Sequence, residues 1–339
     1  MHYRVLLWPH ANARYQNETL KLAAAELEMM LAQLAPGAEI AADERLGMPA
    51  LDLHVDAALD AAAIEALRRH SLLYGLFEDQ GGLLLPVAGR GEAAVGRDLP
   101  AILKYKGKTN ELFLQMLVNV ALYAGAFWRQ DGPLAMLDPM CGRATGLFVA
   151  ANYGWDTVGA DVDRGDLKEA EQFFRRYLEY HRCKHTVTRL SRTLKQGGSA
   201  AECRFEYAAN ARDPRRSLSL LCLDATRSAG ALGRNAFHVI ACDLPYGVRH
   251  DARLSGGSGA KGNWLEALLE RALPEWRAAL KPGGAMALSF NAQNLKLERL
   301  RDLMARAGLE VLAGGVYDGL THWVEQAITR DIAICRKPL

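Results

Sequence analysis

From residue 134 onward, short runs of apolar residues alternate with longer segments in which apolar residues recur every three or four positions. The short runs predict strands and the longer segments predict amphipathic helices. The predicted strands are Leu134–Met140, Thr157–Val162, Leu218–Leu223, His238–Cys242, Ala285–Phe290, Leu309–Val316 and Asp331–Arg336. The predicted helices are Thr145–Asn152, Asp166–Tyr180, Trp264–Leu280 and Leu295–Ala307. This alternation is typical of a mostly parallel sheet with helices on both faces.

The order of these segments predicts an α/β fold with a Rossmann-like sheet of seven strands. The last two strands follow each other with no helix between them, so we expect one of them to run antiparallel near the sheet edge. A further helix, Asn110–Gly125, precedes the first strand and is expected to pack over it.

The front of the chain has its own pattern of short strands and helices. Apolar residues predict strands at Tyr3–Trp8 and Ala50–Val55, and helical spacing predicts helices at Thr19–Leu34 and Ala57–His70. This arrangement favours a small α+β domain of ferredoxin-like type over residues 1–95. The glycine-rich and charged segment 89–100 is expected to link it to a second domain, residues 96–339.

Composition is that of a globular protein. Of the 339 residues, 50% are hydrophobic and 24% are charged, which excludes a disordered chain and a coiled coil. No segment has the roughly 20 uncharged apolar residues that a membrane span needs, and the first residues lack the pattern of an export signal. The six cysteines form no CxxC pair, so we expect no structural metal, no disulfide framework and a cytoplasmic location.

The net charge of +2 conceals an uneven distribution. Residues 1–95 carry 7 basic and 13 acidic residues, and residues 96–339 carry 34 basic and 26 acidic residues. An acidic front domain is therefore joined to a basic body, which is compatible with a polyanionic partner for the body alone.

Small and acidic residues follow the strands of the predicted sheet. In open α/β sheets the ligand lies at the carboxyl ends of the strands, and the segment Asp138-Pro139-Met140-Cys141-Gly142-Arg143-Ala144-Thr145-Gly146 begins at the end of the first one. Such a turn exposes backbone N–H groups to a ligand. Asp161 ends the second strand about twenty residues later, where ribose hydroxyls are commonly held, and Asp224 follows the third.

The fourth strand runs directly into Asp243-Leu244-Pro245-Tyr246-Gly247. This segment brings a carboxylate, a backbone carbonyl stiffened by proline and an aromatic ring to one strand end. The set suits an amino group on a flat ring, because Asp243 and the Leu244 carbonyl accept its two hydrogens while Tyr246 stacks on the ring. The sequence therefore predicts a nucleobase amine as the reacting group.

With these two motifs the chain resembles the class I S-adenosyl-L-methionine-dependent methyltransferases. Asp138-Pro-Met-Cys-Gly together with Asp243-Leu-Pro-Tyr-Gly resembles, more narrowly, the RNA guanosine N2-methyltransferases linked to THUMP domains, which methylate tRNA. The resemblance covers roughly residues 102–339 and includes the approach segment Lys104–Glu111.

The resemblance implies direct methyl transfer without a covalent intermediate or a metal. The residues it implies as catalytic are Asp243, Leu244, Pro245 and Tyr246. The resemblance also implies which residues bind S-adenosyl-L-methionine, namely Asp138, Pro139, Cys141, Gly142, Thr145, Asp161 and Asp224. For the Cys141 side chain, a place in the core is favoured over a chemical role. Lys106 and Lys108 are further candidates for contact with a substrate or cofactor carboxylate.

Two departures from that family change the expectation. The family usually reads Asp-Pro-x-Cys-Gly-(Ser/Thr)-Gly-Thr, and here Arg143 and Ala144 stand at the Ser/Thr and third glycine positions. In addition, 95 front residues have room for the ferredoxin-like module but not for a THUMP domain as well. RNA contact is therefore expected from the body.

A basic segment in the body is the candidate RNA contact. It joins the second helix to an insertion at about 183–216, and it contains Arg175, Arg176, Arg182, Lys184, Arg189, Arg192 and Lys195. Such side chains hold phosphates and give salt-sensitive binding. The expected partner is therefore RNA, most simply tRNA, with no membrane.

Three other functions stay open from the sequence. The amine motif also serves a DNA adenine-N6 or cytosine-N4 methyltransferase, which would need a target-recognition region, and only 183–216 is available for one. A protein-glutamine methyltransferase is disfavoured because Asp243-Leu-Pro replaces Asn-Pro-Pro. A catalytically silent cofactor- or RNA-binding module is suggested only by Arg143-Ala144.

Overall fold

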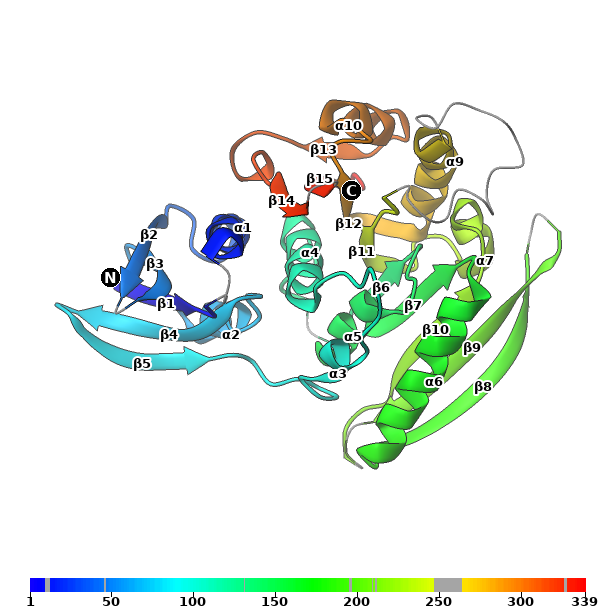
Figure 1. Cartoon of the computed structure of the whole chain (residues 1–339), viewed down its shortest axis with the longest axis horizontal. Helices are drawn as coiled ribbons and strands as arrows, with labels where there is room; N and C mark the ends of the chain where they lie inside the picture. Colours follow the sequence, from blue (N-terminus) through cyan, green and yellow to red (C-terminus); the bar gives the residue numbers. More distant parts are fainter. Residues whose placement is uncertain are drawn as a thin grey trace. The chain divides into compact units, whose positions relative to one another are not determined.

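The computed structural model describes residues 1–9, 13–45, 47–130, 132–194, 197–208, 210, 212–246, 264–325 and 328–339. These residues form two compact units (Figure 1). Unit 1 contains residues 1–92 and 313–325, and unit 2 contains residues 93–312 and 326–339. The segment 313–325, which was expected in the second domain, belongs with unit 1. It packs there against the first helix, where the Lys21 ammonium donates a 2.9 Å hydrogen bond to the Thr321 carbonyl.

Unit 1 is an antiparallel sheet with two helices. Its elements are β1 (His2–Leu7), α1 (Ala13–Leu34), β2 (Glu39–Arg45), β3 (Met48–His54), α2 (Ala61–Leu67), β4 (Leu73–Gln80), β5 (Leu83–Gly89), η2 (Gly315–Tyr317) and β14 (His322–Glu325). The strands lie in the order β2-β3-β1-β4-β5. The first four have the β-α-β-β-α-β connection of ferredoxin-like folds, and β5 is an additional edge strand that forms a hairpin with β4.

Unit 2 is built around one large sheet. Its helices are α3 (Leu99–Ile102), α4 (Glu111–Ala124), α5 (Thr145–Asn152), α6 (Arg164–Tyr180), η1 (Ala225–Arg227), α7 (Ser228–Leu232), α9 (Trp264–Ala279) and α10 (Leu297–Arg306). Its strands are β6 (Ala135–Asp138), β7 (Asp156–Asp161), β8 (Lys184–Thr193), β9 (Ser199–Ala208), β10 (Arg216–Cys222), β11 (Phe237–Asp243), β12 (Leu280–Asn291), β13 (Glu310–Leu312) and β15 (Ile328–Arg336).

The sheet of unit 2 is parallel at its centre. The strands follow the order β13-β15-β12-β11-β6-β7-β10-β9-β8, and all pairs from β12 to β10 are parallel. β15 is antiparallel to β12 and β13, in line with the expectation that one of the last two strands would be antiparallel. The strand expected at Leu309–Val316 is shorter, because the chain leaves the sheet after Leu312 to join unit 1.

The sheet is larger than the seven strands expected. The segment 183–216, expected only as an insertion, contains the antiparallel hairpin β8–β9, and β9 pairs with β10. α6 lies against this hairpin (Figure 1), with Phe174 in ring contact with Phe205 and Tyr207. Aromatic burial on that face explains why the insertion extends the sheet instead of forming a loop.

Two of the hydrophobic clusters hold the larger helices on the sheet. One, around Trp276, Phe290 and Leu269, packs α9 and α10 on the strands β11 and β12. The other, around Phe148 and Phe174, packs α5 and α6 on β9 and β10. None of the described helices is long and apolar enough to cross a membrane.

Candidate functional site

Four strand ends carry a carboxylate at the same edge of the unit 2 sheet. β6 ends at Asp138, β7 at Asp161 and β11 at Asp243, and Asp224 follows β10 by two residues. The parallel register places Asp138 opposite Gly159 and Cys222 opposite Asp161, so the carboxyl ends of these strands coincide. The structure thus brings the acidic residues singled out in the sequence to the edge where open α/β sheets bind ligands.

Asp138 is a buried carboxyl in an acidic setting. Its side chain accepts a 3.2 Å hydrogen bond from the Met140 N–H and a further one from the Cys242 thiol. Burial, with the charges of Asp161 and Asp243 added, raises the pKa of Asp138 to about 7. A cationic group placed beside Asp138 would therefore be bound favourably, because it would stabilise the ionised form.

Asp161 ties the turn after β6 to the end of β7. Its carboxylate accepts 2.8 and 2.9 Å hydrogen bonds from the N–H groups of Gly142 and Asp163. Each carboxylate oxygen has a second lone pair, so Asp161 can still accept from a hydroxyl. Asp163 is the N-cap of α6, as its spacing suggests.

The turn from β6 to α5 is close to the backbone of β7. A side chain at Gly159 would lie 2.7 Å from the Cys141 sulfur and 2.5 Å from Leu147, so only glycine fits there. The Cys141 side chain points into this packed cluster, and burial raises its pKa well above the ordinary value. Cys141 therefore offers its backbone, not its thiol, to a ligand. Pro139 and Thr145 are buried in the same turn, and the Thr145 hydroxyl lies 3.4 Å from that of Tyr105.

Arg143 and Ala144, the two departures from the family motif, have separate structural roles. The Arg143 guanidinium bonds Asp166 at 2.9 Å and Glu169 at 2.6 Å on α6 and lies 4.4 Å over the Tyr105 ring. Arg143 therefore holds the turn after β6 against α6. Ala144 is fully buried and takes a left-handed backbone conformation, with φ of 68°, which explains why the related motif has glycine there.

We expect Ala144→Gly to stabilise the protein by about 1 kcal/mol, because glycine adopts this conformation without the Cβ penalty. The measurement is the free energy of unfolding in urea. Ala150→Gly, inside the same helix, is the matched control and should be destabilising, since glycine costs about 1 kcal/mol in a helix interior. A loss of stability in Ala144→Gly would contradict the strain argument.

Asp243 is held by two hydroxyls and one guanidinium. The Thr109 hydroxyl donates a 2.5 Å hydrogen bond to one carboxylate oxygen, and the Tyr246 hydroxyl donates a short one to the other. Arg330 of β15 lies 3.5 Å from the carboxylate as an ion-pair partner. Burial, followed by the charge of Asp243, raises the pKa of Tyr246.

The backbone of the motif is fixed as well. The Leu244 N–H donates a 2.8 Å hydrogen bond to the Ser289 carbonyl of β12, and the Asn294 amide donates one of 2.8 Å to the Tyr246 carbonyl. Pro245 is partly buried between them, and Gly247 lies outside the described residues. The ring of Tyr246 was expected simply to stack on a base, but its hydroxyl and one of its faces are also engaged by this network.

Sequence reasoning missed Thr109, Arg330 and Asn294. Thr109 belongs to the approach segment Lys104–Glu111, whose match to the family was a usable signal. Arg330 and Asn294 are 84 and 48 residues from Tyr246 in the sequence, and no local pattern distinguishes them. Only the pairing of β15 with β12 brings Arg330 to the end of β11.

Two other candidates have local structural partners. Asp224 is the N-cap of η1, and one of its oxygens accepts from the Thr226 N–H and hydroxyl. Lys108 donates to the carbonyls of Pro100 and Ala101 and forms an ion pair with Glu111 at 3.2 Å. The expected contact of Lys108 with a ligand carboxylate is therefore not favoured, whereas Asp224 retains an oxygen at the strand-end edge.

The basic segment divides into paired and exposed residues. Arg175 and Arg189 bond Glu171, and Arg192 bonds Glu202 at 2.6 Å. Arg189 thereby joins β8 to α6, Arg192 joins β8 to β9, and Arg175 pairs within α6, so the run is partly structural. Arg176, Arg182 and Lys184 are exposed and form no ion pair with another described residue. Lys195 and the glycine-rich segment 255–259 lie outside the described residues.

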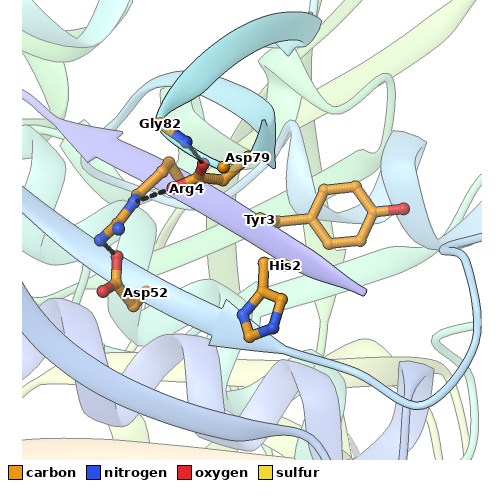
Figure 2. Close-up of a pocket in the computed structure, with 7 residues that line it drawn as sticks. His2, Tyr3, Arg4, Asp52, Asp79 and Gly82 are labelled. Carbon is orange, nitrogen blue, oxygen red and sulfur yellow. Dashed lines mark hydrogen bonds and ion pairs between the residues drawn. The ribbon is translucent and has the colours of Figure 1, made fainter.

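Unit 1 contains a pocket of about 260 Å³ that is unrelated to the predicted motifs. Figure 2 shows Arg4 lying between Asp52 and Asp79, with the Tyr3 ring directed away from them. Arg4 also bonds Asp43 at 2.6 Å. The charged groups of this pocket pair with one another, which indicates a structural ion cluster. Among the described residues, no group of three or more side chains could hold a metal.

Several solved structures have a similar arrangement. A TehB-like SAM-dependent methyltransferase from Corynebacterium glutamicum is 16% identical, with 60% of this chain and 80% of that chain covered and a TM-score of 0.35. A T. thermophilus 16S rRNA N2 G1207 methyltransferase in complex with AdoMet and guanosine is 14% identical, with 90% of this chain and 59% of that chain covered and a TM-score of 0.38. The precorrin-6y C5,15-methyltransferase from Geobacter metallireducens is 13% identical, with 73% and 100% covered and a TM-score of 0.41.

No model of a known protein family and no curated protein sequence matches this chain. Because the identities and TM-scores of the similar structures are low, the function has to be argued from the site itself.

Proposed function

We propose that unit 2 is an S-adenosyl-L-methionine-dependent methyltransferase that methylates the exocyclic N2 of a guanosine in RNA, most simply in tRNA. The observation that carries this proposal is the end of β11. There a buried strand delivers the Asp243 carboxylate, the Leu244 carbonyl and the Tyr246 ring next to the acidic ends of β6 and β7.

The residues at the strand ends fit the cofactor. Asp138, with its raised pKa, suits the ammonium group of the methionine part, and Asp161 suits the ribose hydroxyls. Glycine at 146 lets the first turn of α5 lie close to Asp138, since a Cβ there would approach the Asp138 carboxylate to 3.3 Å, and a Cβ at Gly142 would meet no atom within 4 Å. The backbone of Pro139 and Cys141 would line the same turn, with Thr145 behind it and Asp224 near the adenine amino group. When bound, the cofactor supplies an electrophilic methyl group.

The chemistry required of the protein is positioning. Asp243 and the Leu244 carbonyl accept the two N–H hydrogens of the amine, which directs the nitrogen lone pair toward the methyl group. Asp243 also stabilises the positive charge that develops on the nitrogen during transfer. Tyr246 offers its remaining ring face to the base, which is taken out of its stack.

RNA is the favoured substrate because of the motif resemblance and the exposed cations of α6 and β8. Arg176, Arg182 and Lys184 supply phosphate contacts beside the sheet. We further propose that the front unit, with its net negative charge, restricts which RNAs are bound. Deleting residues 1–92 should then broaden the range of RNAs that the protein binds.

A variant in which glutamine replaces Arg176, Arg182 and Lys184 should bind RNA more weakly, and its RNA binding should depend less on salt concentration. Each lost phosphate contact lowers the slope of log K against log salt by about 0.7 to 0.9, so we expect a decrease of roughly 2. The control is Arg299→Gln with Arg306→Gln on α10, where both arginines are paired with acids. An unchanged slope in the triple variant would remove these residues from the RNA surface.

The experiment that tests the function uses the full chain with isotope-labelled cofactor. Total tRNA, rRNA and DNA are offered separately, and the modified nucleoside is identified by mass spectrometry. N2-methylguanosine in tRNA is the expected product. N6-methyladenine or N4-methylcytosine in DNA would instead establish an amino-methyltransferase of another class, and cofactor binding without transfer to any acceptor would establish a silent binding module.

A further inference from the structure

Arg330 is connected to both oxygens of Asp243 through two hydroxyl groups. Its Nε donates a short hydrogen bond to the Tyr246 hydroxyl, which donates to one carboxylate oxygen. Its Nη2 donates at 3.3 Å to the Thr109 hydroxyl, which donates to the other. The guanidinium fork, two hydroxyls and the carboxylate thus close into one ring of hydrogen bonds.

The direction of every hydrogen bond in this ring is fixed by chemistry. A guanidinium can only donate, so each hydroxyl must accept from Arg330 and has its one hydrogen left for Asp243. Asp243 is therefore an acceptor at both oxygens. The two carboxylate oxygens have about four lone-pair positions, so after accepting from both hydroxyls they can also accept from an incoming amine N–H.

Arg330 itself is held rigidly. It is 7% exposed, and its guanidinium lies 4.7 Å over the Phe113 ring of α4 and 5.1 Å over the Tyr246 ring. Its backbone is paired with Asn291 of β12. Thr109 immediately precedes Asn110, the N-cap of α4. The ring of hydrogen bonds therefore joins three parts of unit 2 that the sheet and α4 already fix in place.

The neighbouring carboxyl has a different environment. Asp138 bonds the Met140 N–H and the Cys242 thiol, and burial raises its pKa to about 7. Asp243, by contrast, has the Arg330 guanidinium 3.5 Å away as an ion-pair partner. The two carboxyl groups are therefore suited to different partners. The Arg330 guanidinium and two hydroxyl donors surround Asp243, and Asp138 is left for a cationic ligand.

We infer that Arg330 is a positioning residue, which acts through the hydroxyls of Thr109 and Tyr246 to keep both oxygens of Asp243 as oriented acceptors for the amine being methylated. This inference rests on the proposed function. It adds a requirement that the motif at β11 cannot meet alone, because the orienting groups come from β15 and from the segment before α4.

The test compares Arg330→Met with Arg336→Met on the full chain. Arg336 lies on the same strand, is exposed and pairs with Glu310, so its loss should leave methyl transfer at the wild-type rate. Arg330→Met should lower kcat by roughly a hundredfold, as for removal of one oriented polar group, with KM for the RNA and the Kd of the cofactor within about twofold of wild type. A merely structural role would move these constants and the thermal midpoint together.

Chemical rescue makes the test specific. Methylguanidinium at millimolar concentration should raise the kcat of an Arg330→Ala protein at least tenfold. Methylammonium should not raise it, because only the planar guanidinium fork reaches both hydroxyls. Thr109→Val, which removes one hydroxyl without changing volume, should lower kcat by roughly tenfold, and Thr109→Ser should lose less.

The two hypotheses fail in different ways. If wild-type protein transfers methyl groups to a base amine and Arg330→Met retains full kcat, the inference about Arg330 is wrong and the proposed function stands. If guanidinium rescue is absent while Arg330→Lys retains full kcat, a fork is not needed and the inference is again wrong. If wild-type protein methylates no amine in any nucleic acid, the proposed function itself is wrong, and the role assigned to Arg330 falls with it.

Discussion

Replacing Asp243 with alanine is expected to abolish most methyl transfer while leaving cofactor binding intact. The substitution removes the acceptor for the amine hydrogens and the charge that stabilises the developing cation, which together are worth roughly a thousandfold in turnover. The cofactor is expected to lie at the ends of β6 and β7, so its affinity by calorimetry should change little. Single-turnover assays with labelled cofactor measure the chemical step directly.

Asp243→Asn refines the same experiment. Asparagine keeps one acceptor oxygen but turns the other position into a donor, which conflicts with either the Thr109 or the Tyr246 hydroxyl. An intermediate loss, of roughly ten- to a hundredfold, is therefore expected. Asp302→Ala on α10, a carboxylate that only pairs with surface arginines, is the matched control. Turnover near the wild-type level in Asp243→Ala would overturn the catalytic assignment.

The central architecture of unit 2 was predictable because its strands are apolar runs at regular spacing. Buried parallel strands such as β11 and β12 have few polar residues, so they are conspicuous. The hairpin β8–β9 was not predicted, because the exposed face of β8 mixes Thr, Arg and Lys and has no strict alternation. The return of 313–325 to unit 1 depends on contacts with α1 that are nearly three hundred residues away in sequence, and local pattern cannot reveal them.

The positions of the acidic candidate residues were predictable at the strand ends. Asp138, Asp161 and Asp243 could be named because a parallel sheet aligns the ends of its strands whatever the side chains are. The groups that orient Asp243 could not be named, since Arg330 reaches the site only through the antiparallel insertion of β15. In the basic segment, sequence counts alone did not separate Arg175, Arg189 and Arg192, which pair with glutamates, from the exposed cations beside them.

Replacing Asp138 with asparagine is expected to stabilise the protein and, at the same time, to weaken its binding of the cofactor. The pKa of Asp138 is raised from 3.8 to about 7, so the folded state prefers the protonated form. The stability associated with that proton is present below about pH 4 and is lost as the pH rises through 7. Three pKa units correspond to on the order of 4 kcal/mol, and asparagine, which cannot ionise, avoids this loss while its oxygen still accepts from Met140.

Urea unfolding at two pH values checks the stability part of this prediction. At pH 8 we expect Asp138→Asn to exceed wild type by up to roughly 4 kcal/mol, and at pH 5 by less than half of that, because less of the wild-type penalty has developed. Asp156→Asn is unsuitable as a control because Asp156 bonds Ser217, but Asp302→Asn on the surface should show no such pH-dependent gain. Equal stability of Asp138→Asn and wild type at pH 8 would contradict the raised pKa.

Calorimetry with the cofactor checks the binding part. Three groups face Asp138, namely Asp161, Asp243 and the Cys242 thiol, and none of them supplies a positive charge. An ammonium group bound there would therefore ionise Asp138 and release about half a proton near pH 7. That release is measured from the dependence of the binding enthalpy on the ionisation enthalpy of the buffer. In Asp138→Asn the proton release should be absent. The affinity for the cofactor should also fall ten- to hundredfold, about 1.4 to 2.7 kcal/mol. Asp138 would then be a residue whose burial lowers the stability of the protein and allows it to bind a cation. If Asp138→Asn kept both the affinity and the proton release, the cation would instead be bound by another carboxylate.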